Sequence, residues 1–196
     1  MAGKAGKPRI VKPASRVSWR SWLERNCASS PGVWLVVSKK GAARPRVLYE
    51  EAVEEALCFG WIDSKPNRRD EESFLLWMAP RKKGSVWSRI NKGRVRRLAA
   101  AGLMTPAGLA KIKEAKRDGS WSSIDNVEAL EVPKDFRAAL ATRPEAGENF
   151  RAFPASSRKI ILFWIQSAKR PATRRKRIAQ AMAMAEKNLR ANHFRQ

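Results

Sequence analysis

The stretch that decides the fold runs from Leu48 to Lys65 and reads LYEEAVEEALCFGWIDSK. Its apolar residues between Val53 and Leu57 recur at helical spacing, and glutamates cover the opposite side. Gly60 follows, and glycine readily adopts the left-handed conformation that ends a helix. Residues 61–65 then alternate in polarity with the period of a strand. The stretch therefore predicts a helix, a glycine stop and a strand that opens on Trp-x-Asp.

Two further apolar runs predict the other strands of a sheet. Residues 33–39 (VWLVVSK) and 73–80 (SFLLWMAP) are rich in β-branched and aromatic residues at both parities. The economical arrangement is a hairpin of 61–65 with 73–80, joined by 33–39 in one antiparallel sheet. Because three strands alone are marginal, helices must pack on the sheet.

The rest of the chain has helical patterns, and these predict about seven or eight helices and a helical C-terminal half. Besides the helix before Gly60, we predict helices over 19–27 with Ser18 as N-cap, between Ser85 and Gly102, from Thr105 to about Lys116, and over 134–141, 144–152, 155–169 and 172–190. Residues 119–132 look irregular. The predicted fold class is α+β, a small three-stranded antiparallel sheet packed by helices.

The N-terminus differs in composition from the rest. Residues 1–17 hold five lysines and arginines with no acid, interrupted by glycine and proline. We predict a flexible basic arm over residues 1–17 and a single α+β domain over residues 18–196.

Charge sets this chain apart. It has 196 residues, 43% of them hydrophobic, with 41 Lys and Arg against 18 Asp and Glu, a formal net charge of +23. Such a balance predicts attraction to polyanions such as nucleic acid, anionic surfaces or acidic proteins. A solvated surface rich in arginine for compositional reasons is an equally good explanation.

Most catalytic and cofactor templates are missing. The only histidine, His193, lies near the C-terminus, the cysteines 27 and 58 are far apart, and no glycine-rich nucleotide motif occurs. We therefore expect no metal site, no cofactor and no His-based catalysis. No secretory signal or membrane-length apolar run is found, so we expect a cytoplasmic protein without a transmembrane segment.

One cluster suggests a ligand pocket. Asn91 lies four residues after Trp87 on the apolar stripe of its helix, and a buried amide needs partners. We predict a candidate pocket for a small-molecule or protein ligand formed by Trp61, Asp63, Arg81, Trp87 and Asn91. The alternative is structural, with Asn91 in a packing network and Asp63 in a buried salt bridge with Arg81, and packing networks are the commoner case.

Two basic clusters suggest a polyanion surface. Residues 81–97 hold eight lysines and arginines and no acid, and Arg174–Arg177 is a basic block at a helix start, where the helix dipole disfavours it. The candidate polyanion-binding residues are Arg94, Arg97, Arg174, Arg175, Lys176 and Arg177. Nucleic acid bound there would be held through its phosphates, without sequence readout.

Several blocks of the chain resemble one family. They include Trp61-x-Asp63, Asp70–Glu71–Glu72, Ala79–Pro80–Arg81–Lys82, Trp87–Ser88, Pro154–Ser157, Trp164–Ile165 and Thr173–Arg177. Together they resemble the bacterial YdeI/OmpD-associated (OmdA-like, bacteriocin-protection) family over roughly residues 18–190. Ser64 departs from the pattern, because many relatives have glycine there.

The resemblance implies a small cytoplasmic α+β protein linked to bacteriocin protection or stress resistance. It supplies no catalytic residues. The sequence therefore favours a non-enzymatic protection protein that acts by binding. The alternatives are a non-specific nucleic-acid binding protein and an undescribed enzyme with a pocket centred on Asp63.

Overall fold

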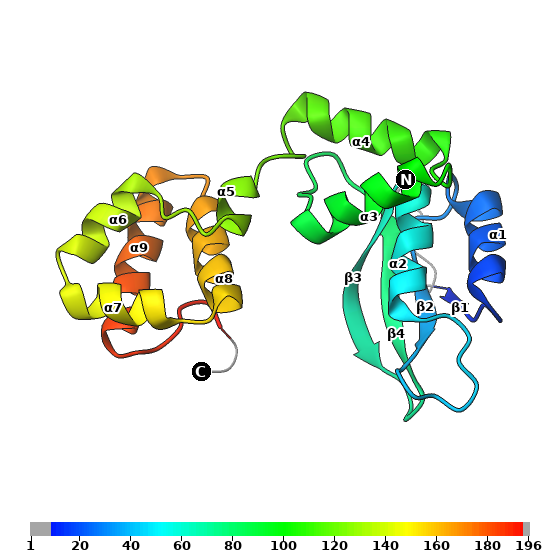
Figure 1. The fold of residues 1–196 in the computed structure, drawn as a ribbon, viewed down its shortest axis with the longest axis horizontal. Helices are drawn as coiled ribbons and strands as arrows, with labels where there is room; N and C mark the ends of the chain where they lie inside the picture. The colour runs from blue at the N-terminus through cyan, green and yellow to red at the C-terminus, as the bar shows by residue number, and fades with distance from the viewer. Residues whose placement is uncertain (1–8, 194–196) are drawn as a thin grey trace, which may run out of the picture. The chain divides into compact units, whose positions relative to one another are not determined.

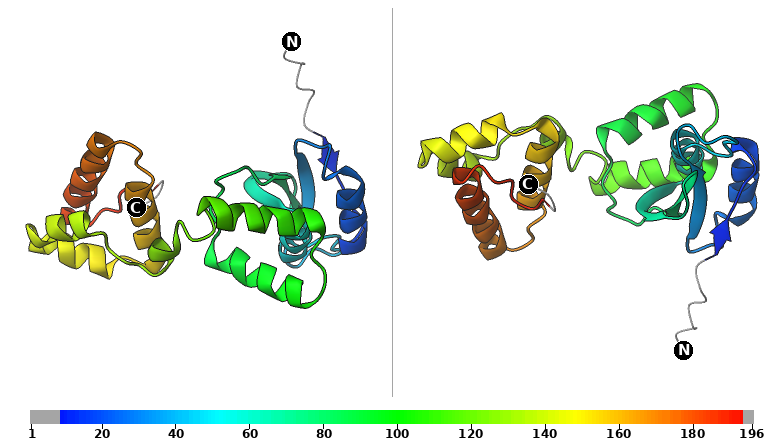
Figure 2. Two further views of the ribbon diagram at one scale, coloured as in Figure 1. Left: turned by 90° about the horizontal axis from the view of Figure 1, so that it is seen from above. Right: turned by 90° about the horizontal axis from the view of Figure 1, so that it is seen from below.

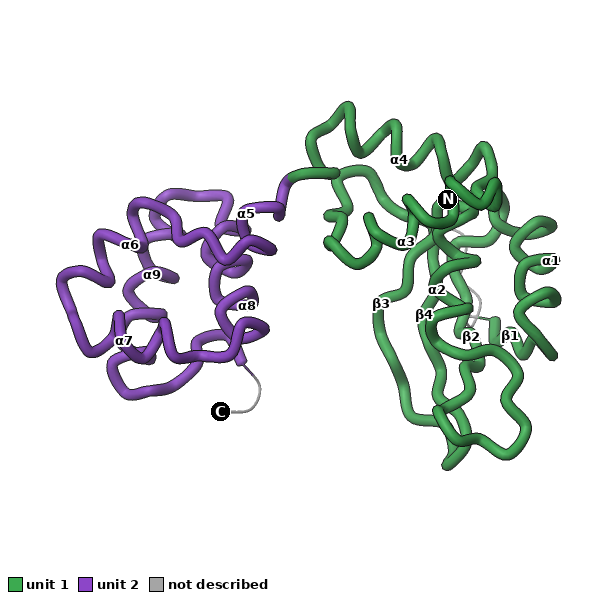
Figure 3. The backbone as a smooth tube through the Cα atoms, viewed as in Figure 1, with its two compact units in different colours: residues 1–122 green, residues 123–196 purple. Residues whose placement is uncertain are grey.

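The computed structural model describes residues 9–193, which form two compact units (Figure 3). The first unit comprises residues 1–122 and the second residues 123–196. Each has its own hydrophobic core, and the two cores share no residue. Residues 18–196, predicted as one domain, fall in two compact units, each of which buries its own apolar faces.

The first unit holds a four-stranded sheet and four helices (Figure 1). Its elements are β1 (Ile10–Val11), α1 (Arg16–Asn26), β2 (Val33–Ser38), α2 (Tyr49–Cys58), β3 (Trp61–Arg68), β4 (Ser73–Pro80), α3 (Arg89–Ala100) and α4 (Pro106–Asp118). The α+β class is confirmed, and β4 pairs antiparallel with both β2 and β3 as predicted.

The prediction of three antiparallel strands needs a correction. The strand order is β1-β2-β4-β3, and β1 pairs parallel with β2, so the sheet is mixed. In both views of Figure 2, β1 and α1 lie side by side at the right-hand edge of the drawing. A two-residue strand is too short to show the alternation by which a strand is predicted from sequence, and its pairing depends on a partner far along the chain. The backbone N–H of Trp34 donates to the carbonyl of Arg9 at 3.0 Å.

Part of the stretch 1–17, predicted to be a flexible arm, has regular structure. Residues 1–8 lie outside the described residues, residues 10–11 belong to the sheet, and α1 begins at Arg16. The N-cap is Ser15 instead of Ser18. Ser18 is the third helical residue, and its hydroxyl accepts from the Ser15 backbone N–H at 2.9 Å, which completes a capping box.

The corner after α2 forms as predicted. The helix ends at Cys58 and Gly60 has φ +74°, the left-handed region that favours glycine. Strand β3 then runs from Trp61 to Arg68, three residues further than predicted, with a register shift between Asp63 and Pro66. The irregularity surrounds Ser64.

The core of the first unit lies between one face of the sheet and all four helices. Val33, Leu35, Val37, Leu76 and Met78 point from the strands into it. Helices α1 and α2 are also linked by Glu55, which is only 4% exposed and binds Arg16 at 2.6 Å and Arg20 at 2.8 Å. A carboxylate this deeply buried requires such partners, because an unpaired buried charge costs several kcal/mol.

The second unit is helical in its described part. Its helices are α5 (Asp125–Glu128), α6 (Lys134–Ala141), α7 (Pro144–Ala152), α8 (Ala155–Gln166) and α9 (Pro171–Glu186). The α6 and α7 bounds match the prediction. The single turn α5 lies in a stretch predicted to be irregular, so residues 9–193 contain nine helices instead of seven or eight. Within those residues, no helix combines the length and the apolar character that crossing a bilayer requires.

Two glycines on neighbouring helices provide a matched test of packing. A Cβ at Gly108 of α4 would overlap the carbonyl group of Cys58, 2.8 Å from its carbon, whereas a Cβ at Gly93 of α3 meets only the end of Arg97 at 3.9 Å. We expect Gly108→Ala to lower the free energy of unfolding by about 1–3 kcal/mol. We expect Gly93→Ala to raise it by about 0.5–1 kcal/mol, since alanine is the better helix former.

Urea unfolding followed by tryptophan fluorescence measures both effects, because seven of the eight tryptophans lie in residues 1–122. Equal effects of the two substitutions would contradict the described packing of α4 on the corner.

Candidate functional site

The structure separates the five residues of the predicted pocket. Trp61 is 1% exposed, packs edge-on against Trp22 and donates its Nε1–H to the carbonyl of Cys27 at 3.1 Å. Its role in the structure is to pack the core. The Asp63 carboxylate accepts a hydrogen bond from the Tyr49 hydroxyl at 2.9 Å.

Asn91 belongs to a structural network. Its side-chain oxygen accepts from Nη1 of Arg94 at 2.7 Å, and the same guanidinium binds Glu50 of α2. Asn91 therefore helps to orient an arginine that joins α3 to α2. This arrangement is the packing network that the sequence analysis gave as the alternative to a pocket.

Arg81 and Trp87 do come together. Arg81 is 4% exposed, and its guanidinium carbon lies 3.6 Å from the centre of the Trp87 ring. Its Nη1 donates to the carbonyl of Val86 at 3.2 Å, while its buried Nε has no hydrogen-bond partner. The salt bridge between Asp63 and Arg81 does not form, and no carboxylate of the described residues lies within ion-pair distance of Arg81. Burial lowers the pKa of Arg81 to about 10, partly offset by the negative charge of Asp63.

Arg81 faces a small cavity between the loop after β4 and helix α4. We call it the Arg81 cavity; its volume is about 10 Å³, room for about one water-sized group. It is lined by Arg81, Lys82, Lys83, Gly84, Ser85 and Trp87 of the loop and by Lys111, Glu114, Ala115, Asp118 and Ser120. The loop is held at the end of α4 because the Asp118 carboxylate accepts from the N–H groups of Gly84 at 3.2 Å and Ser120 at 2.9 Å.

The electrostatics of the Arg81 cavity favour an anion. Lys82 and Lys83 are exposed at its mouth, and the buried guanidinium has no anionic partner. The side chain of Ser120 and the backbone N–H groups of Ser120 and Gly84 bind the Asp118 carboxylate and lower its pKa, and Glu114 is paired with Lys111 at 2.9 Å. Sequence reasoning placed Lys82 and Lys83 in a basic cluster but could not place α4 beside them.

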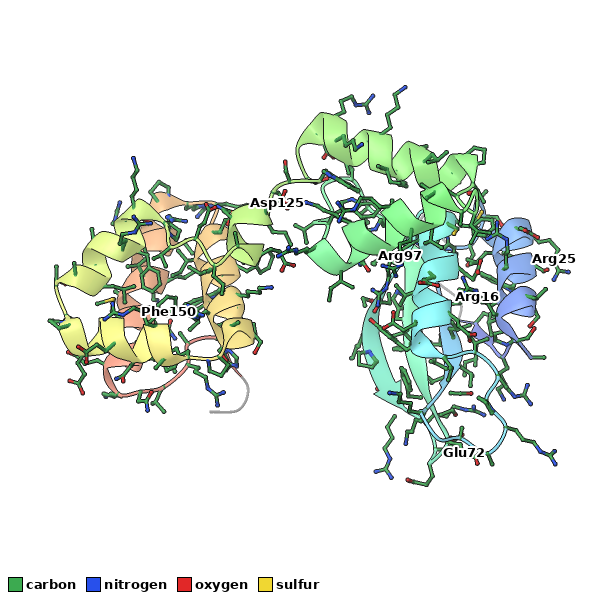
Figure 4. All side chains as sticks on the ribbon, viewed as in Figure 1. Arg16, Arg25, Glu72, Arg97, Asp125 and Phe150 are labelled. Atoms are coloured by element: carbon green, nitrogen blue, oxygen red, sulfur yellow. The ribbon has the colours of Figure 1, made fainter. Side chains whose placement is uncertain are left out.

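The predicted polyanion residues are largely engaged in the fold. Arg94 is 7% exposed and bound to Glu50, and the exposed Arg97 lies 3.4 Å from Glu54 on α2 (Arg97 is labelled in Figure 4). These two arginines bind the acidic side of α2. Neither is displayed as a free cation.

The block Arg174–Arg177 holds two arginines that contact the protein and two residues that are exposed. Arg174 makes two hydrogen bonds to Asp135, at 2.6 and 2.8 Å, and Arg177 binds the carbonyl of Trp164 and the hydroxyl of Ser167. Arg175 and Lys176 are exposed. Because residues three apart share a helix face, the outer pair of the block contacts the protein and the inner pair faces solvent.

In residues 9–193, no group of three His, Cys, Asp or Glu side chains is placed to hold a metal ion.

The structure is that of a two-unit α+β protein with a cationic cavity in its first unit. Residues 11–111, slightly more than half of the chain, match the family model described as Domain of unknown function (DUF8412), and the chain belongs to that family.

The second unit carries the other family match. Residues 129–188 match the family described as Bacteriocin-protection, YdeI or OmpD-Associated, which confirms the family resemblance found in the sequence. The match is narrower than the 18–190 expected, and the corner at 48–65 falls in the first family instead. It suggests a role related to bacteriocin protection. No curated protein and no solved structure matches the chain.

The single tyrosine reports on its hydrogen bond to Asp63. Burial and the Asp63 charge raise the pKa of Tyr49 to about 12. Absorbance at 295 nm should therefore give a midpoint near pH 12 in the folded protein and near the usual value of about 10 in denaturant. Because the folded-state pKa is raised, this contribution to stability is complete below pH 10 and is lost as the pH rises toward 12. Asp63→Asn should lower the folded midpoint only in part, since burial is the larger cause; an unchanged midpoint would contradict the contact.

Arg174 and Arg175 should differ in their effect on stability. Arg174→Ala removes the contact between α9 and α6 and should lower the free energy of unfolding of the second unit by about 0.5–1 kcal/mol, since the pair is partly exposed. Arg175→Ala should change it by less than about 0.5 kcal/mol. Arg174 lowers the pKa of Asp135, so the difference should be present above pH 4 and shrink on acidification. Helical circular dichroism during unfolding measures both variants, and equal effects would contradict the contact.

Proposed function

We propose that this protein serves in bacteriocin protection or stress resistance by binding a partner molecule, without catalysing a reaction. The family match of the second unit supports the biological role. The Arg81 cavity supports binding, and its chemistry selects a ligand that carries a carboxylate or phosphate group.

One observation carries the proposal: Arg81 is a buried cation without an anion. Taking a guanidinium out of water costs several kcal/mol, and proteins normally recover this with a carboxylate. Here stacking on Trp87 and one carbonyl recover only a part. The cavity has room for a single oxygen of such a group, and that oxygen would supply the missing charge and accept from the unpartnered Nε, with the rest of the ligand at the exposed mouth.

Catalysis at Asp63 has less support. The Asp63 carboxylate is held by the Tyr49 hydroxyl, and Asp63 does not line the Arg81 cavity. A general base needs a reactive proton within hydrogen-bond reach in a concave site. The groups described around Asp63 therefore do not favour the enzyme alternative.

Calorimetric titration of the full chain with inorganic phosphate and with acetate tests the proposal. We expect Arg81→Lys to weaken binding about tenfold, because lysine can neither stack on Trp87 nor donate bidentately. Lys83→Gln, at the exposed mouth of the cavity, should weaken binding several-fold without disturbing the core.

The matched control is Lys113→Gln, an exposed residue of α4 outside the lining. It removes the same charge and should leave the affinity unchanged. If neither anion binds the wild type, or if Lys83→Gln and Lys113→Gln weaken binding equally, the cavity is not an anion site.

A further inference from the structure

The sheet of the first unit has one face that takes no part in the core. Because side chains alternate along a strand, Ile10, Trp34, Val36, Leu75 and Trp77 lie opposite the core-facing residues. None of the five belongs to the core cluster, to which all four helices of residues 9–122 contribute, although Val36 itself is only 3% exposed. We call these five residues the outer sheet face.

Two tryptophans occupy the centre of this face. Trp34 and Trp77 are directly paired across β2 and β4, with ring centres 5.3 Å apart and planes at 67°. Both are only half-buried, and Ile10 beside Trp34 is 51% exposed. At Gly32 any Cβ would overlap the Trp77 ring, so the glycine lets the chain pass close to it. The face therefore presents aromatic rings that the core does not use.

A hollow lies at one end of the outer sheet face. Val36 of that face lines it, with Ser38 and Ser73 at the same parity further along β2 and β4, the loop after β2 and the turn between β3 and β4. The volume of the hollow is about 520 Å³. This lies in the range of 300–1,000 Å³ typical of ligand sites. Glu72, labelled in Figure 4, lies in the turn.

The charges around the hollow favour an anion. Arg44 and Arg46 line it and are exposed, and within residues 9–193 neither side chain makes an ion pair. Arg69 donates to the hydroxyl of Ser73 at 2.9 Å and forms an ion pair with Asp70 at 3.5 Å, so its charge is already compensated. The surrounding unit, residues 1–122, holds 26 Lys and Arg against 11 Asp and Glu.

The three acids of the turn are already engaged. The Asp70 carboxylate accepts from the hydroxyl of Ser73 at 2.8 Å and from the N–H groups of Ser73 and Glu72, which lowers its pKa. Glu72 accepts from the N–H of Ala43 at 3.3 Å, and Glu71 pairs with Arg68 at 3.2 Å. The three acids keep their negative charge, but their oxygens are already bound, and the guanidinium groups of Arg44 and Arg46 are the groups of the lining that can bind a phosphate.

We propose that the outer sheet face binds single-stranded nucleic acid. Bases would stack on Trp34 and Trp77, and the backbone would follow into the hollow, where Arg44 and Arg46 meet its phosphates. Aromatic rings on an open sheet beside cations are how many proteins hold single strands, since every base offers a stacking face. A duplex keeps its bases stacked and paired and would gain only the phosphate contacts. This surface is separate from the Arg81 cavity, so either proposal can fail without the other.

Fluorescence anisotropy with labelled dT12, rU12 and a 12-base-pair duplex tests the proposal across a series of salt concentrations. We expect both single strands to bind the full chain more tightly than the duplex. Trp77→Leu should weaken single-strand binding at least fivefold with an unchanged salt slope, because it removes stacking and not charge. Arg44→Gln with Arg46→Gln should weaken binding and reduce the magnitude of the slope of log K against log salt by about 1.4, or 0.7 for each phosphate contact.

The matched control is Arg175→Gln with Lys176→Gln, which removes two exposed charges from the second unit. An equal loss in this control and in the Arg44/Arg46 variant would overturn the proposal in favour of diffuse charge. So would duplex binding as tight as that of the single strands, unaltered binding by a folded Trp77→Leu variant, or no binding by the wild type. If Trp77→Leu fails to fold, the comparison of the Arg44/Arg46 variant with the Arg175/Lys176 variant still tests the proposal.

Discussion

At the end of α2, the carbonyl oxygens of Cys58 and Gly60 accept hydrogen bonds from two distant parts of the chain. Cys58 accepts from the Thr105 N–H at 3.1 Å and from its hydroxyl at 2.7 Å, which fixes the start of α4. Gly60 accepts from the N–H of Arg81 at 2.9 Å, which fixes the end of β4. The corner thereby sets both walls of the Arg81 cavity, the loop on one side and α4 on the other. Position 60 requires glycine for two reasons. Its positive φ is strained for any residue with a side chain, and a Cβ there would overlap the side chain of Lys111.

The high positive charge has two different uses in this fold. Arg16, Arg20, Arg94 and Arg174 bind carboxylates of neighbouring helices and act as cross-links. Arg81 is buried against a ring, and Arg44 and Arg46 remain without ion pairs. Net charge alone therefore predicts attraction to anions but cannot say which cations are free to bind them. In the clusters that are densest in the sequence, Arg81 and Arg94 are buried and Arg174 and Arg177 contact the protein, whereas other members such as Lys83 and Arg175 are exposed.

Local patterns in the sequence predicted most of the fold. Periodicity and capping placed β4, α6 and α7 at their observed bounds and located the glycine stop at Gly60. Contacts between distant residues stayed beyond reach: the pairing of β1 with β2, the Tyr49–Asp63 hydrogen bond and the Arg174–Asp135 pair each join positions at least 14 residues apart. For the same reason only Arg81 and Trp87 of the predicted pocket meet in a cavity. Alternation along β2 and β4 showed apolar residues at both parities, but it could not reveal that one of the two faces would lie outside the core.

The separation of the two hydrophobic cores also bears on how such a gene can change over time. The boundary at residues 122–123 falls between the two family matches, which end at 111 and begin at 129. A recombination event at this seam would cut through neither core, so each half could be inherited, duplicated or exchanged with its buried packing intact. The first half, with its cavity and outer sheet face, and the second, whose helices match the other family model, can thus be regarded as two modules of one chain.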